Sequence, residues 1–104
     1  MTLFILKLAE YTKYPFNRYK SHGRHSAEEF RNDWLAPALK KNYEVVLDLN
    51  DVTGFPASWT EEVFGGLIRS HGYTVSELRN QLKIDVEDFL IEEEIWYHIE
   101  RAVK

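Results

Sequence analysis

The chain contains no cysteine. Disulfide bonds, thiolate nucleophiles and metal sites built on sulfur are therefore excluded, as is typical of a protein from a reducing compartment. Long apolar runs are also missing, because the run near the amino terminus, residues 3–6, is far shorter than the roughly 20 residues of a membrane span. The basic region and cleavage site of a signal peptide are missing too. We therefore expect a soluble cytoplasmic protein.

The sequence motifs of common enzyme classes are absent as well. The chain has neither a P-loop nor a Gly-x-Gly-x-x-Gly motif, so it shows no nucleotide-binding site of its own. Ser58 is not part of a Gly-x-Ser-x-Gly nucleophile elbow, and no histidine follows it in the order of a catalytic triad. The sequence therefore predicts a protein that is not an enzyme and that needs no cofactor.

Residues with the spacing of metal ligands are few. The histidines are scattered, and only His22 and His25 lie three residues apart, in a stretch with loop character. Asp48, Asn50 and Asp51 carry oxygen ligands that suit a hard cation, but such side chains more often cap turns. We therefore predict no metal site.

Charge is distributed unevenly along the 104 residues, whose net charge is −4. Residues 1–25 carry five basic side chains against one acid, a balance of +4, and residues 26–104 carry eight against 16, a balance of −8. The basic segment interleaves aromatic side chains, and its Pro15 and Gly23 oppose a long helix. We expect a loop there, with a short strand as an option near residues 16–20.

Two interpretations of this basic segment stay open. It is either a solvated loop that covers a sheet edge, or a surface that grips the phosphate of a nucleic acid or of a nucleotide held by a partner. The residues that would act in the second interpretation are Lys13, Arg18, Lys20 and Arg24. Nucleic acid is the less expected ligand, because the rest of the surface is acidic and repels a polyanion.

The stretch that organises the chain is residues 43–72. It begins with a nearly unbroken run of β-branched and aliphatic residues, which is typical of a central strand covered on both faces. Turn formers and helix breakers follow, and Ser58 then occupies the expected N-cap of a helix, with Glu61 three residues on. This order puts Ser58 at the carboxyl end of the central strand, where α/β proteins commonly bind ligands and partners.

The remaining segments complete an α/β fold. We expect a strand over residues 2–9, a helix capped by Ser26 with a kink or a break into two pieces near Pro37, a short helix after Thr74, an edge strand over residues 83–87 and a long helix over residues 88–104. Gly72 should end the helix after Ser58, and the adjacent Gly65 and Gly66 inside it indicate close backbone approach to the sheet. The prediction is a single domain, residues 1–104, in which helices pack on a short mixed sheet.

Ser58 has two interpretations. As an N-cap it would contribute about 1 kcal/mol to stability and nothing else. As a phosphoacceptor it would place a phosphate on free helix N–H groups, which favour it, while Glu61 and Glu62 in the first turn would repel it. Both interpretations remain open from the residues alone.

Several stretches resemble a known family. They are SHGRHSAEEFRNDWLAPALKKN, then YEVVLDLNDVTGFPASWTEEVFGGLIRSHG, and the ending LKI…EEIWYHIERA. This pattern resembles the STAS-like family of unknown function found in bacteria, archaea and their mobile elements, a divergent relative of the anti-sigma-factor antagonists. The resemblance covers nearly the whole chain from about Arg18, and it implies a small STAS-like sandwich.

The resemblance also implies a function. Ser58 matches the serine that a GHKL-type kinase phosphorylates in anti-sigma-factor antagonists, so the implied function is regulatory, with a GHKL or histidine-kinase-like ATPase as partner. The residues expected to contact that partner are Asp48, Asp51, Phe55, Pro56, Trp59 and Glu62. A homodimer is left open. The alternative function is binding of a nucleic-acid or nucleotide phosphate through the basic segment.

Overall fold

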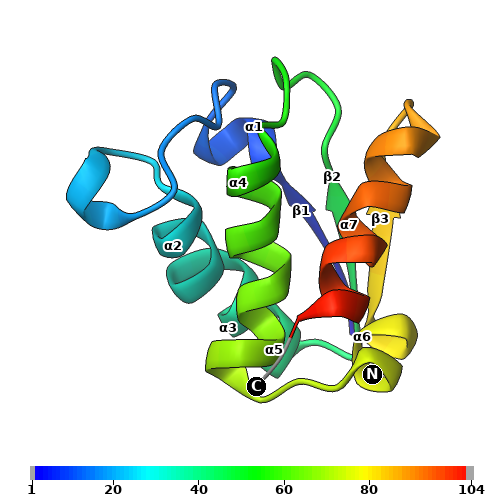
Figure 1. Cartoon of the computed structure of the whole chain (residues 1–104). Coiled ribbons are helices and arrows are strands. Elements are labelled where there is room, and N and C mark those ends of the chain that lie inside the picture. Colours follow the sequence, from blue (N-terminus) through cyan, green and yellow to red (C-terminus); the bar gives the residue numbers. More distant parts are fainter. Residues whose placement is uncertain (1, 103–104) are drawn as a thin grey trace.

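Three parallel strands form the sheet in the computed structural model of the chain, which describes residues 2–102 (Figure 1). They are β1 (Leu3–Lys7), β2 (Glu44–Asp48) and β3 (Leu82–Asp85), in the spatial order β1-β2-β3. The predicted central strand is therefore confirmed. The sheet is parallel and not mixed, because a helical crossover separates each strand from the next and the segment near residues 16–20 adds no strand.

Only one face of the sheet is covered by the core, which corrects the expected coverage of both faces. Strands that follow one another in spatial order through right-handed crossovers place their helices on the same side. Val45 and Leu47 of β2 are accordingly buried, whereas Val46 is half-buried and its neighbour Ile5 is 56% exposed. An unbroken apolar run in the sequence does not reveal this difference.

The first helical run lies between β1 and β2. It comprises α2 (Ala27–Phe30), the π-helical turn η2 (Arg31–Leu35) and α3 (Ala36–Lys41). Ser26 caps it as predicted, accepting a bond from the Glu29 amide at 3.0 Å. Pro37 does not break the run. The wider turn immediately before it, in which the Ala36 amide donates to the Arg31 carbonyl, accommodates the proline ring and its missing donor.

The second helical run follows β2 directly. It comprises α4 (Ala57–Thr60), the π-helical turn η3 (Glu61–Gly65) and α5 (Gly66–His71), and Gly72 ends it at φ 74° as predicted. The run begins earlier than expected, because the Pro56 carbonyl accepts from the amides of Trp59 and Thr60 and Pro56 is the N-cap. Ser58 thus lies within the first turn, and the prediction that it caps the helix is wrong.

Shorter elements complete the chain. They are α1 (Leu8–Tyr11), the 3-10 turn η1 (Lys20–His22), α6 (Val75–Gln81) and α7 (Phe89–Arg101). Thr74 and Glu77 form the predicted capping box of α6 with both of its hydrogen bonds. The predicted last helix is confirmed over α7, and its expected end at Lys104 lies outside the described residues.

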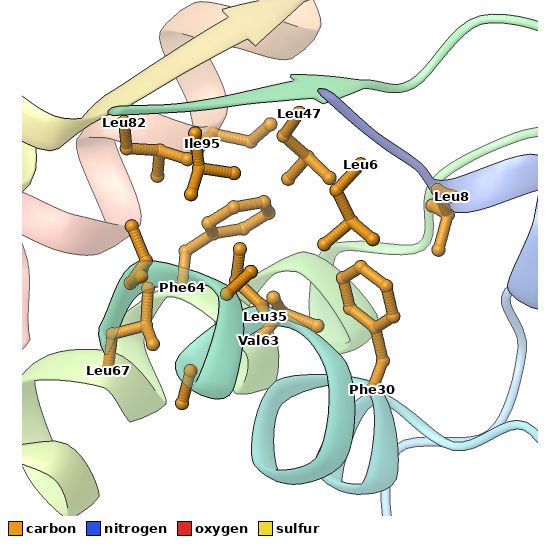
Figure 2. Close-up of a cluster of buried hydrophobic side chains, with 14 of the residues drawn as sticks. Leu6, Leu8, Phe30, Leu35, Leu47, Val63, Phe64, Leu67, Leu82 and Ile95 are labelled. Atoms are coloured by element: carbon orange, nitrogen blue, oxygen red, sulfur yellow. The ribbon is translucent and has the colours of Figure 1, made fainter. Parts of the chain in front are cut away.

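The core lies between the sheet and the helices (Figure 2). Leu47 and Leu82 of the sheet meet Phe64 of the second helical run and Ile95 of α7, and all of these side chains are at most 1% exposed. Burial of such side chains stabilises the fold by about 1.5–3 kcal/mol each. Across residues 2–102, every helix is too short or too polar to cross a membrane.

Candidate functional site

The loop after β2 forms part of the carboxyl end of the sheet. Asp48 Oδ1 accepts bonds from the backbone amide and the side-chain amide of Asn50, both at 2.9 Å, and Asn50 Oδ1 accepts from the Glu87 amide at 3.1 Å. Asp51 is exposed and has a φ of 65°. These groups shape a turn and join it to the loop after β3. No cluster of metal-ligating side chains occurs between residues 2 and 102.

The basic segment lies against the loop after β2 and the helix that follows. The Thr53 amide donates to the Lys13 carbonyl at 2.8 Å. Five residues further along, Arg18 contacts both Glu61 and Glu62 of η3. Residues 13–18 therefore run beside the start of the second helical run, and the two sites considered from the sequence lie at one end of the molecule (Figure 1).

Three arginines and two glutamates form an ion-pair network, defined here as Arg18, Arg31, Arg69, Glu61 and Glu62. Arg18 Nε lies 2.9 Å from Glu62 Oε1, and its Nη2 lies 2.5 Å from Glu61 Oε1. Arg31 Nη1 donates to Glu62 Oε2 at 2.6 Å and to the Glu62 carbonyl at 2.7 Å. Glu61 also forms an ion pair with Arg69. The network thus fastens the basic segment to both helical runs.

Burial and pairing decide the electrostatics of this network. Arg31 and Glu62 are 4% and 7% exposed, so neither charge is solvated and each needs the other. Partial burial alone would raise the pKa of Glu61, but the hydrogen bond from Arg69 and the charges of Arg69 and Arg18 outweigh it and hold that pKa below its usual value. With three cations to two anions, the network has a formal charge of +1.

The adjacent glycines serve this network. A β-carbon at position 66 would lie 2.1 Å from Arg31 Nη1, so only glycine leaves room for the buried guanidinium. A β-carbon at position 65 would lie 2.5 Å from Glu61 Oε2 and 2.8 Å from Arg69 Nη1. The predicted close approach is therefore to arginine and glutamate side chains and not to the sheet, which corrects the interpretation of Gly65 and Gly66.

Ser58 is exposed on the first turn of the second helical run. Its hydroxyl takes part in none of the side-chain hydrogen bonds found between residues 2 and 102. Glu61 and Glu62 follow it by three and four positions, so these side chains share one helix face. Phe55 and Pro56, immediately before α4, are half-buried and border the same turn.

Two of the residues expected to contact a partner are placed in the interior. Trp59 is 1% exposed, and its ring centroid lies 5.8 Å from that of Phe30. The expectation that Trp59 presents its indole beside Ser58 is wrong, because neighbours in a helix point about 100° apart and Trp59 falls on the core side with Val63. Glu62 is also unavailable, because its carboxylate is buried between Arg18 and Arg31.

Among the basic residues considered for phosphate binding, Arg18 is held in the ion-pair network. Lys13, Lys20 and Arg24 are exposed. Between the first two, the rings of Tyr14 and Phe16 stack with centroids 6.4 Å apart, and the two side chains are 61% and 62% exposed. The segment therefore presents an aromatic pair with cationic neighbours.

Sequence reasoning missed Arg31 and Arg69 as members of the site. Both lie on helices and have no unusual local pattern, and their partners Glu62 and Glu61 lie 31 and 8 residues away in sequence. The adjacent pair Gly65-Gly66 was the only signal, and it indicated a close approach without indicating what approaches.

Comparison with protein families identifies one that covers the central part of the chain. Residues 26–85, more than half of the chain, match the model of a family described as a STAS-like domain of unknown function (DUF4325). The matched range runs from the Ser26 cap to the end of β3 and so includes β2, both helical runs and Ser58. No match was found among curated proteins or among solved structures.

Proposed function

The chain belongs to the STAS-like family of unknown function, and from that membership we propose that it is a regulatory protein-interaction module without catalytic activity of its own. The family supports a regulatory role at this coarse level. The α/β fold with its parallel sheet agrees with a small STAS-like domain. The place of the proposed docking surface is argued from the geometry at the carboxyl end of the sheet, and the kind of partner from the resemblance of Ser58 to the phosphorylated serine of anti-sigma-factor antagonists.

The proposed docking surface is the Ser58 rim, defined as Asp51, Phe55, Pro56 and Ser58. The observation that carries the proposal is that Ser58 is exposed on the first turn of the helix that follows the central strand. Phe55 and Pro56 add apolar area beside it, and Asp51 adds an exposed carboxylate. A small apolar centre with polar neighbours is a common composition for a protein interface.

Phosphorylation of Ser58 is the proposed switch of this surface, with a GHKL or histidine-kinase-like ATPase as the partner. Glu61 and Glu62 oppose an added phosphate less than their sequence positions indicate, because both are already paired with arginines. Arg18 contacts Glu61 and Glu62 on the helix face that also carries Ser58. A phosphate on Ser58 would compete with these two carboxylates for the Arg18 guanidinium. Phosphorylation would thereby loosen the basic segment from the helix.

Copurification from the native host tests the docking surface. The variants Ser58→Ala, Ser58→Glu and Phe55→Ser should each change recovery of the partner, and Ser58→Glu should differ from Ser58→Ala if charge is the switch. Ser76 is a matched control, because it is exposed and is likewise the second residue of its helix. Ser76→Ala and Ser76→Glu should leave recovery unchanged. Equal recovery with all of the Ser58 rim variants refutes the proposal.

A second candidate function is binding of a phosphate-bearing ligand by the basic segment. The stacked and exposed rings of Tyr14 and Phe16 favour it. In proteins that bind single-stranded nucleic acids, aromatic rings stack on the bases and neighbouring cations contact the phosphates. Binding of a single-stranded oligonucleotide should then weaken with salt and fall further in Lys13→Glu/Lys20→Glu. Binding that is absent at low salt removes this candidate.

A further inference from the structure

The outer edge of β1 is left unused by the proposed function. β1 is an edge strand, and its side chains Leu3, Phe4 and Ile5 are 59%, 42% and 56% exposed. Within residues 2–102, β2 is the only strand that pairs with β1. An exposed apolar edge of this kind pairs readily with a further strand, and proteins normally blunt or cover it.

The backbone register shows which groups this edge presents. The Glu44 amide donates to the Thr2 carbonyl at 3.1 Å, and Leu3 is the register partner of Glu44. In a parallel ladder this arrangement directs the backbone groups of Thr2, Phe4 and Leu6 toward β2. The N–H and C=O groups of Leu3, Ile5 and Lys7 therefore point outward, in the alternating pattern that an antiparallel partner strand needs.

A groove of about 420 Å³ borders the same edge, between β1 and the first helical run. Phe4, Trp34, Pro37 and Ala38 give it an apolar floor. The groove runs beside β1. A strand added to this edge would extend the sheet, and side chains on one of its faces would lie over the apolar floor.

The ends of this groove carry opposite charges. Lys41 lies where β1 begins, since its carbonyl accepts from Thr2 Oγ1 at 3.5 Å. Glu10 lies in α1, directly after the end of β1, and lines the groove together with Asp33. All three charged side chains are exposed, and none takes part in the ion pairs formed among residues 2–102.

We propose that a second copy of this chain occupies the edge, with the two β1 strands antiparallel about a twofold axis at Ile5. That register pairs Ile5 with its own copy and Leu3 with Lys7, and all of these residues have outward backbone groups. The same twofold axis brings the basic end of each groove to the acidic end of the other. The edge is thus complementary to itself in hydrogen bonding and in charge, and the dimer has a continuous sheet of six strands.

Sedimentation analysis of the chain, with any tag at the carboxyl end, measures the dimer dissociation constant. Ile5→Lys places one positive charge from each copy at the twofold axis. Ile5→Pro removes the outward backbone N–H at an edge position that tolerates proline. Each variant should raise the dimer dissociation constant at least about 30-fold. Phe89→Lys is the matched control, because Phe89 is 66% exposed on α7 and should leave the constant unchanged. Circular dichroism verifies that each variant is folded.

A charge exchange tests the register without altering the strand. Lys41→Glu should raise the dissociation constant roughly tenfold, because the twofold axis repeats the lost pair. Lys41→Glu/Glu10→Lys should restore part of the affinity, because Asp33 stays at the acidic end of the groove. A chain that stays monomeric at all concentrations, including one that binds a different protein at this edge, overturns the proposal. So does a dimer that is insensitive to both the Ile5 and the Lys41 variants. Either result leaves the Ser58 rim proposal unaffected.

Discussion

Arg31 fills the space above Gly66, where a β-carbon would lie 2.1 Å from its Nη1 atom and 2.8 Å from its Cδ and Cζ atoms. The guanidinium is held there by two bonds to Glu62, one to the carboxylate and one to the backbone carbonyl. This contact joins the first helical run to the second and sets the position of the helix that carries Ser58. Substitutions at this contact should therefore alter the stability of the fold first, and binding at the Ser58 rim only as a consequence.

Gly66→Ala should lower the free energy of unfolding by about 1–3 kcal/mol, although alanine is the better helix former. The new methyl group displaces a buried side chain that two hydrogen bonds to Glu62 hold in place. Gly65→Ala is the control, since its neighbours are the partly exposed ends of Glu61 and Arg69, which can shift. It should be neutral or stabilising by up to about 1 kcal/mol. Urea denaturation measures both, and equal effects would contradict the described contact.

Arg31→Met should lower the free energy of unfolding by about 3 kcal/mol, because it leaves the buried Glu62 with one ion-pair partner fewer. The double variant Arg31→Met/Glu62→Met should regain much of that loss, since it removes both buried charges and fills their space. Thermal or urea unfolding of the unchanged chain, of Arg31→Met, of Glu62→Met and of the double variant gives the coupling directly. A double variant as unstable as the sum of the single ones would contradict the pairing.

The low pKa of Glu61 predicts a dependence of stability on acid. Because its folded pKa lies below the unfolded value of about 4.3, the ionised carboxylate stabilises the fold above that pH, and the contribution is lost as pH falls through the folded pKa. Glu61→Gln should therefore be less stable than the unchanged chain near pH 7, by about 1 kcal/mol, and the difference should vanish in strong acid. A difference that is constant with pH would show that the ion pair is not its cause.

Structural features that depend on a few neighbouring residues were predicted correctly from the sequence. The Ser26 cap, the capping box at Thr74 and the stop at Gly72 each involve side chains or backbone within one turn of a helix. The α/β class and the central position of β2 also followed from hydrophobic pattern and element order. Such features are fixed locally, so an isolated sequence contains them.

Features that depend on distant residues were not predicted. Arg18 meets Glu61 across 43 residues, and no local pattern connects the two. The sequence predicts Trp59 at the partner surface with Ser58, yet one step along a helix carries a side chain from the solvent face to the core. The open second face of the sheet also depends on the handedness of both crossovers, which an apolar run does not encode.

Photocrosslinking from position 58 in the native host shows whether a partner docks at the Ser58 rim. A benzophenone side chain placed there should yield one prominent adduct with a second protein, a GHKL-type ATPase, while the same side chain at position 76 should not yield it. Recovery of that adduct only from position 58 is the result predicted for a docking surface at the Ser58 rim. Identical adducts from both positions, or none from position 58, would contradict it.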